Sequence, residues 1–204
     1  MPTVQTVSFP ASDAFLEALS NDPDKIKDPL TGLLGAKGHI SSFYGLQVED
    51  KKIVYFVSVW ESLEARQAFT KDPSYAELIE KIKPAAAAPL ERHHIDVKGD
   101  AKTAFVSPVT ELVVFTLKPE GTPEKVVPLF EELAKGLDAA VGARPPCMWG
   151  QSIDDKTKFL VHVGWDTVAA HWEAVKEGTD LNKTVGKLGA LADFSLGHSR
   201  LKQG

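Results

Sequence analysis

The chain has 204 residues, a length that suits one domain or two domains of about 100 residues each. A net charge of −5 without a cluster of lysine and arginine argues against nucleic-acid binding. The single cysteine, Cys147, excludes an intrachain disulfide framework and a cysteine-rich zinc module. No apolar run approaches the ~20 residues of a membrane span, and the first residues lack a secretory signal pattern. We therefore expect a cytoplasmic protein without a membrane partner.

The first half of the chain predicts the element order strand, helix, strand, strand, helix, strand. Strands are expected at 3–9, 39–48, 53–60 and 93–97 because apolar residues alternate there or run continuously. Ser12 is a typical helix N-cap for a short helix from Asp13, and a second helix is expected over 62–83 with a break at Asp72-Pro73. In the third strand both faces are largely apolar, which indicates that both are buried.

The second half repeats this order at an offset of 105 residues. Residues 149–170 (WGQSIDDKTKFLVHVGWDTVAA) align without a gap on residues 44–65 (YGLQVEDKKIVYFVSVWESLEA), so that Trp165 matches Trp60. Strands are expected at 109–117, 146–153, 158–165 and 195–201, and helices at 122–141 and 167–190. This is the ferredoxin-like, or split βαβ, pattern. We predict an α+β protein with one ferredoxin-like repeat in 1–100 and another in 101–204, joined by a linker at about 98–107, whose open sheet faces cover each other.

In both repeats a hydrophobic strand ends in Trp, an acidic residue and Ser or Thr, followed by an alanine-containing helix. The two stretches read VSVWESLEARQAFTKDPSYAELIEKIKP (57–84) and VHVGWDTVAAHWEAVKEGTDL (161–181). They resemble the antibiotic-biosynthesis-monooxygenase-like branch of the dimeric α+β barrel superfamily, here as a tandem fusion. The second stretch has His171 where that family often carries His, whereas the first has Arg66. The resemblance implies an intramolecular α+β barrel that takes a small-molecule ligand.

Three residues of the second half are the candidate catalytic groups. His162 lies within an apolar strand, where the first half has Val57, and Gly164 is expected to clear space beside its ring. Glu111 shares a strand face with apolar residues and needs a partner there, and His162 on the neighbouring strand is the expected one. His171 is a candidate by its family position. The alternative for His162 is a structural role in the core, and for His171 it is an exposed or capping position. The alternative for Glu111 is a position near a strand end from which its carboxylate reaches water.

Five residues are candidates for binding a substrate: Trp149, Trp165, Tyr55, Arg144 and His198. The aromatic side chains can line an apolar pocket, although Trp165 recurs as Trp60 and is expected to be a core anchor. Arg144 can hold an anionic group or remain solvated. The offset of 105 pairs His198 with His93, and this symmetric placement favours a structural role for the two histidines. It pairs Glu111 with Thr6 and His162 with Val57, and these polar additions of the second half indicate that the active pocket lies there.

The sequence lacks the usual nucleotide-, flavin- and zinc-protease motifs, and we expect neither a metal nor an organic cofactor. The main prediction is a cofactor-independent enzyme, a monooxygenase or a cyclase or isomerase, that uses a histidine base on a small aromatic or polyketide-like molecule. One alternative is a non-catalytic small-molecule-binding or stress-related protein. Another is a haem-binding or haem-degrading protein, with His171 or His198 as the axial ligand. A further homodimer is possible.

Overall fold

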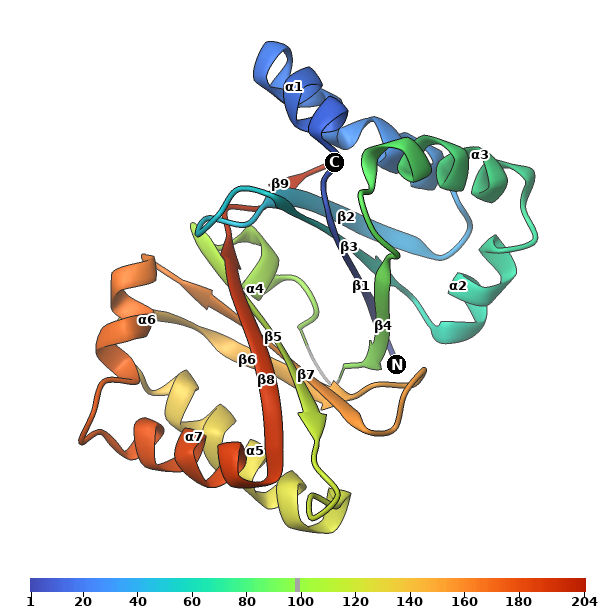
Figure 1. The fold of residues 1–204 in the computed structure, drawn as a ribbon. Helices are drawn as coiled ribbons and strands as arrows, with labels where there is room; N and C mark the ends of the chain where they lie inside the picture. Colours follow the sequence, from blue (N-terminus) through green and yellow to red (C-terminus); the bar gives the residue numbers. More distant parts are fainter. Residues whose placement is uncertain (98–99) are drawn as a thin grey trace. The chain divides into compact units, whose positions relative to one another are not determined.

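The computed structural model describes residues 1–97 and 100–204, and these form two compact units. One unit comprises Met1–Ala101 together with Leu201–Gly204, and the other comprises Lys102–Arg200. Each unit contains an antiparallel sheet with helices against it, as Figure 1 shows. Within the described ranges, no helix is long and apolar enough to cross a membrane.

The first unit is built around a sheet with the strand order β4-β1-β3-β2-β9. Its strands are β1 (Thr3–Pro10), β2 (His39–Leu46), β3 (Ile53–Trp60), β4 (Glu91–Asp96) and the C-terminal β9 (Lys202–Gln203). Its helices are α1 (Asp13–Asn21), the 3-10 helix η1 (Pro23–Leu33), α2 (Leu63–Phe69), α3 (Pro73–Ile82) and the 3-10 turn η2 (Lys83–Ala85). The apolar residues between the sheet and these helices, among them Phe9, Phe56 and Leu78, form one buried core.

The second unit has a four-stranded sheet in the order β6-β7-β5-β8. The strands are β5 (Val109–Leu117), β6 (Ala143–Gln151), β7 (Lys158–Trp165) and β8 (Ala192–Ser199). The helices are α4 (Thr103–Val106), α5 (Pro123–Asp138), α6 (Val168–Ala174) and α7 (Asp180–Leu191). In each unit the first strand lies between the third and fourth strands, so the predicted α+β class with two ferredoxin-like halves is confirmed.

Local sequence signals account for most helix boundaries. Ser12 Oγ accepts a hydrogen bond from Phe15 N at 3.2 Å, and the expected break at Asp72-Pro73 separates α2 from α3. The single helix expected over 167–190 is wrong, because the chain forms α6 and α7 with Gly178 between them at a φ of +90°. That left-handed conformation suits glycine, and it lies in the turn between Ala174, where α6 ends, and Asp180, where α7 begins.

The segment predicted as a linker contains structure. Positions 98–99 of that prediction lie outside the described residues, but Thr103–Val106 form the helix α4. Phe105 on α4 is completely buried, and α4 contacts β6 and β7. The linker prediction is therefore wrong for Thr103–Val106, which pack against the sheet of the second unit.

Candidate active site

Glu111 is a buried carboxyl group on the helix-covered face of the second sheet. On β5 it lies opposite Val163 of β7 and His198 of β8, and its Oε2 accepts a hydrogen bond of 2.8 Å from Trp165 Nε1. Burial raises the pKa of Glu111 from 4.5 to about 7, and the Trp165 hydrogen bond, which favours the ionised form, opposes this shift. Near neutral pH this carboxyl group can both accept and release a proton.

Two buried histidines extend from Glu111 as a chain. His171 Nε2 lies 3.3 Å from Glu111 Oε1, and His171 Nδ1 lies 3.0 Å from His198 Nε2. Between the two rings one nitrogen must donate and the other accept. We assign the donor to His198 Nε2–H, so that His171 Nδ1 accepts and its Nε2–H faces the carboxylate. This tautomer of His171 favours the ionised form of Glu111.

The helix α6 brings His171 to the carboxyl group. Thr167 caps the helix by accepting a hydrogen bond from Ala170 N at 3.0 Å, and His171 follows one turn later on the face turned to the sheet. The Trp165 and Trp172 rings flank the imidazole, with ring centroids 5.3 and 4.5 Å from that of His171. These contacts fix the ring in place beside Glu111.

A cavity of about 320 Å³ lies beside Glu111 and His171, between the sheet and the helices α5, α6 and α7. Its size falls in the range of small-molecule sites. Its walls are mainly apolar, with Phe115 and Leu133 among them, whereas Lys176 and Asn182 add polar groups. The arrangement is an apolar chamber with one titratable carboxyl–imidazole pair in its wall.

Two aromatic residues of this cavity were missed from the sequence. Trp172 and Phe194 line it while remaining 51% and 47% exposed. A large ring that stays accessible to solvent at a cavity can contact an entering ligand. The sequence signal of Trp172, an aromatic residue next to His171, is too general to assign it a role.

The predicted pairing of Glu111 with His162 is wrong. In the register of β5 and β7, His162 lies opposite Leu112, so its side chain is on the other face of the sheet from Glu111. His162 is completely buried, and its ring centroid lies 5.5 Å from that of Phe105. Gly164 does not clear space for the imidazole. A Cβ there would lie 2.1 Å from Ser107 Oγ, so this glycine accommodates the chain that follows α4.

The structural counterparts in the two units differ from those given by the constant offset. Glu111 lies opposite Val163 and His198, and the residue with the same neighbours in the first unit is Gln5, which lies opposite Ser58 and His94. The pairings of Glu111 with Thr6 and of His198 with His93 are therefore each displaced by one residue. One residue changes the face of a strand, so both pairings were wrong.

The remaining predicted residues lie at different places. Trp165 is buried in the core, as expected, and also donates to Glu111. Trp149 stacks on Phe130 with a centroid separation of 5.5 Å. Arg144 is half exposed and donates from Nε to Asp166 at 2.7 Å, and Tyr55 is in the first unit. Among the described residues that line the 320 Å³ cavity, Trp149, Arg144 and Tyr55 are not present.

The described residues contain no group of three or more His, Cys, Asp or Glu side chains arranged to hold a metal ion. In the chain from Glu111 to His198, the histidine nitrogens face each other rather than a common point. The carboxyl group of Glu111 and the imidazole of His171 are groups that can take part in proton transfer.

Solved structures with the same fold cover almost the whole chain. A proposed monooxygenase of Fusobacterium nucleatum is 13% identical with a TM-score of 0.71, over 99% of this chain and 93% of that one. A proposed monooxygenase of Lactobacillus acidophilus is 11% identical with a TM-score of 0.65, over 100% and 95% of the two chains. An anthrone oxidase-like protein is 15% identical with a TM-score of 0.72, over 99% and 92%.

No family model and no curated protein sequence matches the chain. The similarity to known proteins is therefore one of structure, and it extends over both units. The resemblance predicted from the two Trp-containing stretches is confirmed at the level of the fold: the chain shares the fold of these structures, with two ferredoxin-like halves in one chain.

Proposed function

We propose that the protein is a cofactor-independent monooxygenase that oxidises a small aromatic, anthrone-like molecule in the cavity of the second unit. The observation that carries the proposal is the carboxyl group of Glu111, which lines an apolar cavity, contacts His171 and has a pKa of about 7. A general base works best when its pKa lies near the working pH. In this proposal Glu111 replaces the histidine that the sequence favoured as the base.

The first step is removal of a proton from carbon. In an anthrone-like molecule, a CH₂ group between aromatic rings is acidic because the negative charge spreads onto the carbonyl oxygen. Glu111 accepts this proton, and the cavity wall, with Phe115 and Leu133, holds the aromatic rings away from water. The resulting carbanion is rich in electrons and can act as the reductant of dioxygen.

The remaining steps use dioxygen directly. The carbanion gives one electron to O₂, and the two radicals combine to form a peroxide on the same carbon. Glu111 returns its proton to the peroxide and then takes the second hydrogen of this carbon as a proton while the O–O bond breaks. The departing hydroxide accepts that proton from Glu111 and becomes water. The CH₂ group and O₂ thereby become a carbonyl group and one water molecule, so the substrate supplies all of the electrons.

His171 and His198 position the base. In the assigned tautomer, His171 Nε2–H faces Glu111 Oε1 while Trp165 Nε1–H holds Oε2, so both oxygens have a fixed orientation. His198 selects this tautomer by donating to His171 Nδ1. The anthrone oxidase-like neighbour supports the substrate class, since it shares the fold over almost the whole chain.

Anthrone itself is a suitable probe for the proposed reaction. Oxygen uptake and quinone formation are measured with the wild-type protein, with Glu111→Gln and with Glu131→Gln, an exposed glutamate on α5 that serves as the matched control. We expect Glu111→Gln to lower the rate above the uncatalysed background by roughly 10²–10⁴-fold, and Glu131→Gln to leave it unchanged. Anthrone that binds in the cavity without being consumed would instead support the non-catalytic binding alternative.

A further inference from the structure

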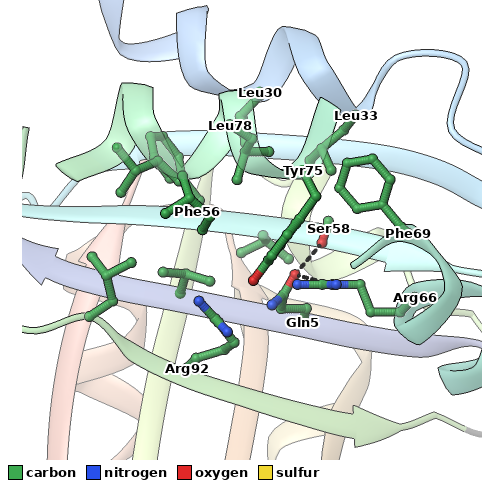
Figure 2. Close-up of a pocket in the computed structure, with 15 residues that line it drawn as sticks. Gln5, Leu30, Leu33, Phe56, Ser58, Arg66, Phe69, Tyr75, Leu78 and Arg92 are labelled. Carbon is green, nitrogen blue, oxygen red and sulfur yellow. Dashed lines mark hydrogen bonds between the residues drawn. The ribbon is translucent and has the colours of Figure 1, made fainter. Parts of the chain in front are cut away.

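A second polar cluster occupies the corresponding place in the first unit. Gln5 of β1 is the counterpart of Glu111, and Arg66 of α2 takes the position of His171. These two residues line a small cavity of about 30 Å³ between the sheet and the helices, together with Ser58, Tyr75 and Arg92 (Figure 2). The described residues that line this cavity include two arginines and no carboxylate.

Arg66 is held firmly in the wall of this cavity. It is buried, its Nε donates to Gln5 Oε1 at 2.8 Å, and its guanidinium carbon lies 5.3 Å from the centroid of the Tyr75 ring. The ring faces of Trp60 and Phe69 are also within 6 Å of the guanidinium group. Cation–π contacts of this kind stabilise a buried guanidinium group but leave its positive charge in place.

Gln5 can offer only donors to a ligand. Its Oε1 accepts from Arg66 Nε and also from Ser58 Oγ at 3.2 Å, which uses both lone pairs of the amide oxygen. The N–H groups of its amide remain. In Figure 2 the amide of Gln5, the hydroxyl end of Tyr75 and the guanidinium group of Arg92 point toward the same region of the cavity.

Arg92 has a buried donor atom that a ligand could satisfy. Within residues 1–97 and 100–204, its Nε is buried and has no hydrogen-bond partner. A buried donor of a charged group that stays unsatisfied costs stability, so such groups are normally paired. The converging amide, phenol and guanidinium donors would satisfy an acceptor that carries negative charge.

We propose that this cavity binds a small planar oxyanion of the carboxylate class, such as formate. A guanidinium group presents paired N–H donors whose geometry matches the two oxygens of a carboxylate. The volume of about 30 Å³ corresponds to one or two water molecules, which restricts the ligand to the smallest anions. This inference does not rest on the proposed oxygenase activity, because it concerns residues of the other unit.

Calorimetric titration with sodium formate in a chloride-free buffer tests the proposal. We expect saturable binding of one formate per chain with a Kd of about 1 mM or tighter. Arg92→Met should weaken binding at least tenfold, whereas Arg144→Met, which removes a half-exposed arginine, should leave the Kd unchanged. Circular dichroism confirms that each variant is folded.

Gln5→Glu provides a second, independent variant. It places a carboxylate among the same donors, so formate binding should disappear while the melting temperature is maintained or raised. The proposal is overturned if formate does not bind saturably, if Arg92→Met binds it as the wild type does, or if Gln5→Glu leaves the affinity unchanged. Chloride that competes as well as formate does would overturn the assignment to a planar oxyanion.

Discussion

Gln5 and Glu111 occupy the same position in the two sheets of this protein. Gln5 lies opposite Ser58 and His94, and Glu111 lies opposite Val163 and His198. The two sites differ in charge because one has an amide at this position and the other has a carboxyl group. The neutral Gln5 accompanies the cation Arg66, whereas Glu111 can ionise next to His171.

The stability of the protein should depend on pH through Glu111. Its folded pKa of about 7 lies above the ordinary value of 4.5, so the folded state binds more protons between these values. The contribution of Glu111 to the free energy of unfolding is therefore complete below pH 4.5 and falls as the pH rises to 7, by about 3 kcal/mol.

Urea unfolding of the wild type and Glu111→Gln at pH 4.5 and pH 8 measures this effect. The wild type should lose about 3 kcal/mol more than the variant over this interval, because glutamine does not ionise. The same loss in both proteins would show that Glu111 does not titrate with a raised pKa.

His198 should act as a positioning residue. His198→Ala removes the donor to His171 Nδ1, and we expect kcat to fall roughly tenfold, the equivalent of one hydrogen bond of about 1.4 kcal/mol. KM should change little, since His198 is not among the described residues that line the cavity. His198→Gln, which keeps an N–H donor, should recover part of kcat. His94→Ala, the counterpart in the first unit, is the matched control and should leave kcat unchanged.

Trp165 should tune the base as well as fill the core. Trp165→Phe removes the N–H that favours the ionised form of Glu111, so the pKa of Glu111 should rise by about one unit. The midpoint of the pH–rate profile should move upward by the same amount. Trp60→Phe is the control because Trp60 Nε1 donates to Ser58 Oγ instead. If the midpoint of the pH–rate profile is unchanged in Trp165→Phe, the Trp165 hydrogen bond does not influence the pKa of the catalytic base.

Filling the cavity should prevent binding without unfolding the protein. Val185 lines the cavity from α7 and is only partly buried, so Val185→Trp can place an indole in the 320 Å³ space. We expect KM for anthrone to rise at least tenfold and the melting temperature to fall by no more than about 12 °C, since overpacking costs about 1–3 kcal/mol. Unchanged KM would mean that the substrate binds elsewhere.

The order of elements could be predicted from the sequence because strand periodicity and the repeated Trp motif are local signals. Local signals also located Ser12 as a cap and the break at Asp72-Pro73. The register between strands was not local, and the offset of 105 residues suggested Thr6 rather than Gln5 as the counterpart of Glu111. A displacement of one residue reverses the face of a strand, so this small difference changed the partners.

The partner of Glu111 could not be predicted for the same reason. Proximity of β5 to β7 suggested His162, but the pleat places His162 on the opposite face. The actual neighbour, His171, comes from α6, and only the packing of this helix on the sheet brings it within 3.3 Å. The cavity was also invisible in the sequence because its walls come from six separate elements.

The pH dependence of kcat/KM for anthrone oxidation tests the central claim most directly. If Glu111 is the base, kcat/KM should rise with pH, level off above an apparent pKa of about 7, and show no such step in Glu111→Gln, whose rate should be roughly 10²–10⁴-fold lower. A Glu111→Gln protein that retains both the rate and the step near pH 7 would contradict the account and assign the titration to another group.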